Sequence, residues 1–212
     1  MQLSRSILAH EELDQVQLSK SFHMRDFLAS DIAEFYGLPN IPENPDIAIR
    51  AAARLCQDLL EPLQERYGKL SIRAAYRSRL VHGFREKFHE AHPTEYCCAA
   101  EAAQAETLIW DQNGESGAME AGICIALPQA SDRFAPGADW RSLAWWIHDN
   151  LEYSSQVYFE AGDTFFLSWS ENPARVIESR MEPVGILTRP GMANHGIDHS
   201  GWYAGGKLRR LN

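Results

Sequence analysis

One stretch in the first half of the chain constrains the fold more than any other. Apolar residues recur every three or four positions between Asn44 and Gly68, and this spacing predicts an amphipathic helix. Asn44 is suited to the N-cap, Pro45 to the first helical position and Gly68 to the stop. Pro62 lies inside the helix and is expected to kink its last turn. The alternating residues of Leu70–Tyr76 then predict a strand.

The segments before and after this pair are also predicted to be helical. Residues 22–37 have apolar side chains at helical spacing, and Ser30 or Asp31 is suited to capping a second short helix that ends at Gly37. After the strand, residues 80–91 and the alanine-rich residues 99–105 are predicted to form helices.

The second half of the chain changes to short apolar segments bounded by turn residues. These segments predict strands at residues 108–110, 118–127, 156–159 and 165–169. A helix that Asp139 can cap is expected to run from Trp140 to about Asn150. Helices followed by an antiparallel sheet with one inserted helix predict a single α+β domain over residues 1–212. Its core is expected at about residues 18–175, with residues 176–212 forming a loop-rich C-terminal wrap.

Composition excludes several classes of protein. The 212-residue chain is 45% hydrophobic, which allows a substantial core, and its net charge of −9 disfavours nucleic acid as a partner. The sequence has no apolar run of about 18 residues, so no membrane span is expected. The first residues lack the apolar centre of a signal peptide, which predicts a cytoplasmic protein. Homo-oligomerisation is left open.

The four cysteines do not indicate a disulfide framework or a thiolate zinc site. Cys56, Cys97, Cys98 and Cys124 include no pair with C-x-x-C spacing. We therefore interpret them as small apolar side chains in a reducing compartment.

The order of helix, strand and Tyr76-Arg77-Ser78 resembles the beginning of the hedgehog/DD-peptidase superfamily. This superfamily includes zinc D-Ala-D-Ala carboxypeptidases and peptidoglycan-cleaving lysins. The segment SFHMRDFLASD (residues 21–31) is similar to the lead-in of many members. The resemblance covers roughly residues 18–175. It implies an antiparallel sheet packed against helices and, in typical members, a catalytic zinc ion.

The zinc ligands that the resemblance implies are mostly missing from this chain. An S-x-H-x-x-G-x-A-x-D motif fits best where Gln104 stands at the first histidine and Asp111 at the carboxylate. An E-x-x-H-x-S motif places Asp163 at the glutamate and Phe166 at the second histidine. Since a phenyl ring cannot coordinate a metal and an amide is a poor zinc ligand, no zinc is expected there. An alternative register puts Ala118 and Ile125 at the histidine and carboxylate positions, and it lacks ligands too.

The resemblance also implies a polar cleft. The arginine that matches Arg77 helps to hold the substrate in relatives, and a guanidinium suits a carboxylate. Tyr76, Ser78 and Gln104 are then candidate ligand-binding residues, and Asp111 and Asp163 are candidates for acid–base chemistry on a small amino-acid-like or peptide ligand, without a cofactor. The alternative is a structural Arg–Asp pair in a cleft that has lost its function.

Histidines elsewhere offer a second possibility for a metal. His195 and His199 enclose Asp198 within five residues, and Asp111 with His195 or His199 is an alternative zinc set. His148 is interpreted as a cation near a helix end. His82, His89 and His92 are interpreted as a solvated helix face.

Three functions remain open on the sequence alone. The first is a zinc-free domain that binds, or carries out metal-free chemistry on, a small ligand. The second is an active zinc peptidase or amidase with unusual ligands. The third is a non-catalytic interaction module, such as a component of a phage particle or a secretion machine.

Overall fold

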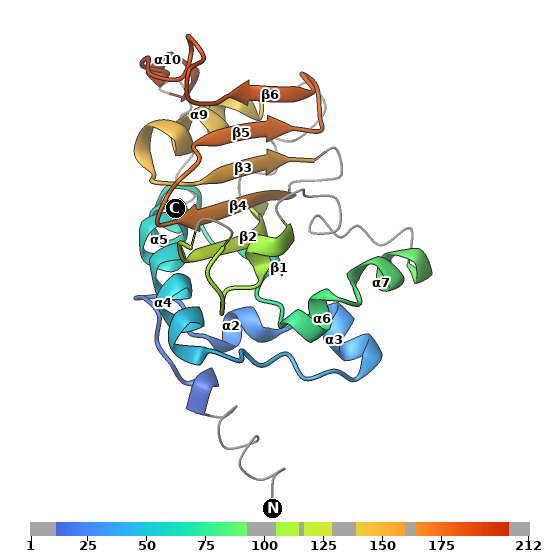
Figure 1. Cartoon of the computed structure of the whole chain (residues 1–212). Coiled ribbons are helices and arrows are strands. Elements are labelled where there is room, and N and C mark those ends of the chain that lie inside the picture. Colours follow the sequence, from blue (N-terminus) through green and yellow to red (C-terminus); the bar gives the residue numbers. More distant parts are fainter. Residues whose placement is uncertain (1–11, 93–104, 115–116, 129–138, 160–163, 204–212) are drawn as a thin grey trace, which may run out of the picture.

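The computed structural model describes residues 12–92, 105–114, 117–128, 139–159 and 164–203. These residues form an α+β structure with a six-stranded mixed sheet in the order β1-β2-β4-β3-β5-β6 (Figure 1). The strands are β1 (Ser71–Ala74), β2 (Glu120–Ala126), β3 (Ser155–Tyr158), β4 (Thr164–Ser170), β5 (Val176–Ser179) and β6 (Gly185–Thr188). Neighbouring strands are antiparallel except β3 and β5, which are parallel. The α+β class is therefore confirmed, but the expected purely antiparallel sheet is wrong.

The predicted long helix is present and packs against the sheet. It consists of α4 (Pro45–Leu55), the π-helical turn η1 (Cys56–Leu60) and α5 (Glu61–Tyr67). Pro45 begins α4, and Gly68 follows α5 with a φ of 86° that favours glycine. Pro62 lies in the first turn of α5, and the irregularity of the helix is the π-helical turn η1, which ends two residues before the proline. Helix α4 contacts β2 and β4.

Four short helices lie at the β1 side of the molecule in Figure 1: α2 (Arg25–Leu28), α3 (Asp31–Tyr36), α6 (Arg79–His82) and α7 (Arg85–Ala91). The Ser30 hydroxyl accepts a hydrogen bond from the Ala33 N–H, and Gly37 ends α3 in the left-handed region, as predicted. The helix expected over residues 80–91 is divided into α6 and α7. The helix expected at residues 99–105 lies almost entirely outside the described residues.

The second half of the chain differs from the prediction in two places. Instead of the strand expected at residues 108–110, the chain forms the 3₁₀ helix η2 (Ala105–Leu108) followed by a turn. The expected C-terminal wrap supplies β5 and β6, which extend the sheet, before a loop and the short helix α10 (Ser200–Tyr203). The expected helix after Asp139 is α9 (Arg141–Asn150).

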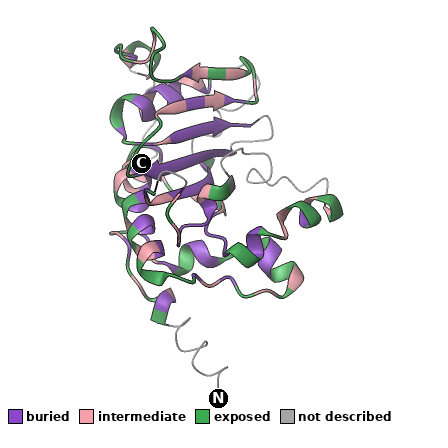
Figure 2. Ribbon diagram, in the orientation of Figure 1, coloured by how far each residue is buried: buried purple, intermediate pink, exposed green. Residues whose placement is uncertain are grey.

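The core surrounds β4, all of whose residues are buried (Figure 2). Phe165, Leu167 and Trp169 belong to the main hydrophobic cluster, which includes the buried apolar residues of α4, α5 and α9. Phe166 points to the other face, as the alternation of a strand requires. There it packs in a second cluster with Leu108, Cys124, Val157 and Phe159.

The cysteines differ from one another. Cys124 is disulfide-bonded, which corrects the expectation that the cysteines are all thiols. Cys56 is a free thiol buried in the main cluster, as expected. Cys97 and Cys98 lie outside the described residues. Within the described part of the chain, no helix combines the length and apolar character needed to cross a bilayer.

We expect Gly122→Ala to lower the free energy of unfolding by about 1–3 kcal/mol, the usual cost of forcing volume into a packed core. An added Cβ would lie 2.5 Å from the Phe166 ring. Chemical denaturation measures the change. Gly83→Ala is the matched control, because its Cβ would meet only backbone oxygens at 3.5 Å, and we expect it to change stability by about 0.5 kcal/mol at most. A Gly122→Ala protein as stable as the parent would contradict this packing.

Candidate functional site

The position at which the resemblance expects the second zinc histidine is occupied by packed apolar side chains. Phe166 is fully buried, and its ring lies directly over Gly122. Its neighbours in the second cluster include Leu108 and Cys124, which are also fully buried. Two other residues that the resemblance assigns to the zinc motifs, Gln104 and Asp163, lie outside the described residues.

The sheet register also bears on the alternative alignment. Ile125 belongs to the main cluster, whereas Phe166 faces the second cluster on the opposite side of the sheet. The residue paired with Phe166 is Cys124, one position earlier. A one-residue shift turns a side chain to the other face of a sheet. In the alignment through Ala118 and Ile125, Ile125 stands at the carboxylate position of the zinc motif. This position therefore lies on the opposite face of the sheet from Phe166.

Asp111 has a structural role at the N-terminal side of α4. Its Oδ2 accepts a hydrogen bond from the Glu43 N–H at 2.6 Å, and its carbonyl oxygen accepts one from the Asn44 side-chain amide at 3.1 Å. Its carboxylate also faces the Tyr76 hydroxyl. Burial, with the Asp111 charge as the next cause, raises the pKa of Tyr76 well above its usual range. Asp111 thus joins the loop before α4 to the end of β1.

The Tyr76-Arg77-Ser78 turn is held by Asn40, a residue that the sequence reasoning did not single out. The Asn40 amide donates to the carbonyl oxygens of Leu28 and Tyr76 at 2.9 Å each, and its Oδ1 accepts from the Ser78 N–H at 2.7 Å. Ser78 also caps α6, since its hydroxyl accepts from the N–H of Val81, the third residue of that helix. Such local side-chain bonds to backbone are typical of asparagine and serine at turns.

Arg77 is buried with the rest of this turn. Only 4% of its surface is exposed, and its N–H donates to the Leu108 carbonyl at 2.8 Å. Tyr76, Ser78 and Asp111 are exposed by 5% or less. The structure therefore places Tyr76, Arg77, Ser78 and Asp111 inside packed structure, with the Tyr76 hydroxyl facing Asp111.

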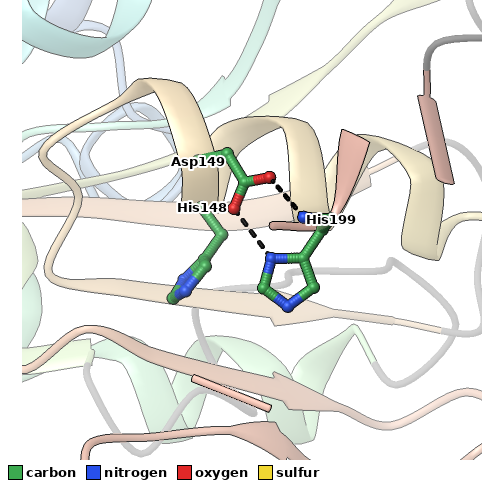
Figure 3. Close-up of side chains that lie close together, drawn as sticks. All are labelled: His148, Asp149 and His199. Carbon is green, nitrogen blue, oxygen red and sulfur yellow. Dashed lines mark hydrogen bonds and ion pairs between the residues drawn. The ribbon is translucent and has the colours of Figure 1, made fainter. Parts of the chain in front are cut away.

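The described residues bring together one group of three potential metal ligands: His148, Asp149 and His199, whose ligand atoms lie within 4.8 Å of one another (Figure 3). His148 and Asp149 come from the last turn of α9, and His199 comes from the segment after β6. We call residues 189–203 the C-terminal segment. Asp111 does not belong to this group, so the alternative set of Asp111, His195 and His199 is not assembled.

His148 joins the end of α9 to the C-terminal segment. Its Nε2 lies 2.9 Å from the His195 carbonyl oxygen, and its Nδ1 lies 2.7 Å from the Tyr153 hydroxyl. A carbonyl can only accept, so Nε2 carries a hydrogen, and in the neutral ring Nδ1 accepts from the Tyr153 hydroxyl. Both hydrogen bonds are therefore compatible with a neutral imidazole. Burial lowers the pKa of His148, and the nearby Arg175 guanidinium lowers it further.

Arg175 completes the C-terminal end of α9. Its guanidinium donates to the carbonyl oxygens of His148 and Leu151, both at 2.5 Å, and lies 4.5 Å from the centre of the Tyr153 ring. These carbonyls lack partners within the helix, and a cation interacts favourably with that end of the helix dipole. Arg175 has a φ of 55°, in the left-handed region that few residues other than glycine adopt.

His199 is fixed by a carboxylate and an aromatic ring. Its Nδ1 lies 2.8 Å from Asp149 Oδ1, and its Nε2 lies 2.8 Å from the Asn194 carbonyl oxygen. The Asp149 Oδ2 accepts from the His199 N–H at 3.1 Å and from the Tyr203 hydroxyl at 2.9 Å. The imidazole stacks on Trp145, with ring centres 3.7 Å apart and planes within 5°. Trp145 thus contributes to the core and to this contact.

The hydrogen bonds decide what the cluster can do. Both ring nitrogens of His148 and of His199 already have oxygen partners at 2.7–2.9 Å. A metal ion would have to displace at least one bond on each imidazole, because a ligating nitrogen must present its lone pair. In this arrangement the cluster attaches the C-terminal segment to α9.

The sequence contained part of this site. The spacing of His195 and His199 indicates the correct segment. The position of His148 suggests only an interaction with the helix dipole, and no local pattern indicates that Asp149 is the partner of His199. The interpretation of His82 as solvated is wrong, because His82 is 4% exposed and its Nε2 lies 3.2 Å from Glu106 Oε1.

Comparisons with protein-family models, with curated proteins and with solved structures found no match to this chain.

We expect Asp149→Ala to lower the free energy of unfolding by about 1.5–3 kcal/mol, because it removes an ionic acceptor from the side chain of His199. The loss should be seen in chemical denaturation at neutral pH. Asp198→Ala is the control, since the Asp198 carboxylate is on the same segment but accepts from nearby Ser200. Equal losses in the two variants would argue against a special role for Asp149.

Proposed function

We propose that this chain is a non-catalytic binding domain with a hedgehog/DD-peptidase-like fold that has lost its zinc centre. The observation that carries this proposal is the position of Phe166. A fully buried phenyl ring, packed over Gly122, stands where the resemblance expects a zinc-binding imidazole. Since three protein ligands and an open position are the usual requirement for catalytic zinc, this packing leaves no room for the ion.

The polar residues of the supposed cleft support the same conclusion. Asp111 bonds the loop before α4, and Ser78 bonds Asn40 and caps α6. Residues that hold backbone segments in place are not available to a substrate without rearrangement. The polar groups that the resemblance assigns to catalysis would then contribute to folding instead.

The C-terminal half offers apolar surface for a partner. Val184, Ile197 and Trp202 are exposed by 63%, 58% and 45%. Single exposed apolar residues are common, but they are also what a partner protein would cover. A component of a larger particle, such as a phage or secretion assembly, or a homo-oligomer would use the domain in this way.

The proposal predicts a protein without stoichiometric zinc and without peptidase activity. After purification in the absence of chelators, elemental analysis should find well under one zinc per chain. Peptides that end in D-Ala-D-Ala should remain uncleaved. One zinc per chain that is lost in Asp111→Ala, or in His199→Gln, would contradict the proposal and favour a peptidase with unusual ligands.

The binding role has its own test. Co-expression with the proteins encoded beside this chain should yield a complex that survives size-exclusion chromatography. Ile197→Asp should weaken that complex if the C-terminal segment is the contact surface. Phe35→Asp is a matched control on α3, because Phe35 is equally exposed, at 56%. Failure of all neighbours to bind, together with a strictly monomeric chain, would count against a binding module.

A small-molecule ligand is the second candidate, and the buried Arg77, next in the chain to Tyr76, favours it. A buried guanidinium can bind the carboxylate of an amino-acid-like molecule. We expect an amino acid or dipeptide to raise the melting temperature of the protein in a thermal-shift assay. Arg77→Lys should reduce this increase, since lysine cannot form a bidentate contact with a carboxylate. An equal response in Arg77→Lys, or none in the parent protein, would eliminate this candidate.

A further inference from the structure

Three imidazoles gather where the C-terminal segment meets α9. The ring centres of His148 and His195 are 4.8 Å apart, and those of His148 and His199 are 5.4 Å apart. His148 belongs to α9, and the other two belong to the C-terminal segment. The side chains of His148 and His199 both bond carbonyls of that segment, at His195 and Asn194. These imidazoles therefore contribute to the attachment of the segment.

The pair of His199 and Asp149 accommodates one proton. The Asn194 carbonyl and the Asp149 carboxylate are both acceptors, so the two hydrogen bonds of His199 are complete when each ring nitrogen has a hydrogen. The same ring stacks on Trp145, so the pair is also held by an aromatic contact.

Further protons have no such partner. His148 is buried and accepts from Tyr153, and the Arg175 guanidinium donates to the His148 carbonyl. The His195 Nδ1 lies 3.3 Å from the Thr188 hydroxyl. Neither Tyr153 nor Thr188 offers a negative charge to a protonated ring. Burial is the main cause of a lowered pKa at both His148 and His195, and the charges of Arg175 and of His199 add to it.

We propose that His148, His195 and His199 form an acid-sensitive latch, which holds the C-terminal segment on α9 near neutral pH and releases it on mild acidification, before the sheet unfolds. The charged and titratable groups that face the latch come from every element around it. Asp149 belongs to α9. Tyr153 lies just before β3, and Arg175 lies just before β5. Asp198 and Tyr203 belong to the C-terminal segment. Asp149 is the anion that contacts the ring of His199.

The direction of the pH effect follows from the lowered pKa of His148 and His195. In the released segment these rings take up protons at the usual histidine pKa of about 6.5. In the attached segment they resist protonation until a lower pH. The attached form is therefore fully favoured above about pH 6.5 and loses stability as the pH falls below it.

Hydrogen exchange tests the latch directly. The backbone N–H groups of His195, His199 and Trp202 are hydrogen-bonded in the attached segment and serve as probes. Between pH 7 and pH 5, after correction for intrinsic exchange, we expect their protection to fall by up to about tenfold per pH unit for each proton taken up. The amides of β4 serve as the internal reference and should keep their protection.

His148→Gln is the decisive variant. The glutamine amide can donate to the His195 carbonyl, its oxygen can accept from Tyr153, and it cannot take up a proton. We expect the C-terminal segment of this variant to remain attached at pH 7. The change in the logarithm of its protection factor between pH 7 and pH 5 should be at most half of that in the parent protein. His195→Gln should remove a further part of the pH dependence of protection. It is also the substitute test if His148→Gln does not fold. His23→Gln, in a histidine remote from α9, should behave as the parent protein.

Three outcomes would overturn the latch. The first is protection of the C-terminal segment that does not change between pH 7 and pH 5. The second is a parallel loss of protection in β4, which would mean global unfolding. The third is an unchanged pH dependence in both His148→Gln and His195→Gln. None of these outcomes bears on the absence of zinc at Phe166, so the latch and the proposed function are tested separately.

Discussion

Strand β4 lies between two layers of side chains, and this two-sided burial is the constraint on which the rest of the structure depends. Phe165, Leu167 and Trp169 face the helices, while Phe166 fills the opposite face with Leu108 and its neighbours. A strand covered on both faces cannot tolerate an unpaired polar group. The helix layer, the 3₁₀ turn at Leu108 and the sheet order all serve to enclose this strand.

That enclosure has a direct consequence for function. A catalytic zinc site needs polar ligands and a water-filled position, and the interior around Phe166 provides neither. The polar residues that remain at the end of β1 bond the backbone of neighbouring segments, as Asn40 and Asp111 do. These contacts support the non-catalytic role that we propose for the domain.

The sheet and the C-terminal segment are held by different kinds of force. The sheet depends on apolar burial, which changes little with pH. The C-terminal segment depends on hydrogen bonds between imidazoles, carbonyls and Asp149, which change when protons bind. The proposed latch therefore opens without loss of the sheet, and regions of lower local stability are where binding and switching usually occur.

The sequence by itself determined the elements whose signals are local. The helix that begins at Pro45, the cap at Ser30 and the apolar strands β2 and β4 could all be recognised, because periodicity and capping act within a few residues. The absence of imidazole at position 166 could also be read directly. These features need no knowledge of what lies across the sheet.

Only the tertiary structure decided which side chains meet. The parallel pairing of β3 with β5 and the contact of His199 with Asp149, 50 residues earlier, join distant parts of the chain. The tertiary structure also shows that Asp111 supports the loop before α4 and that His82 is buried. Such contacts depend on register and packing between segments, and no local pattern encodes them, because a side chain's partner is set by the fold around it.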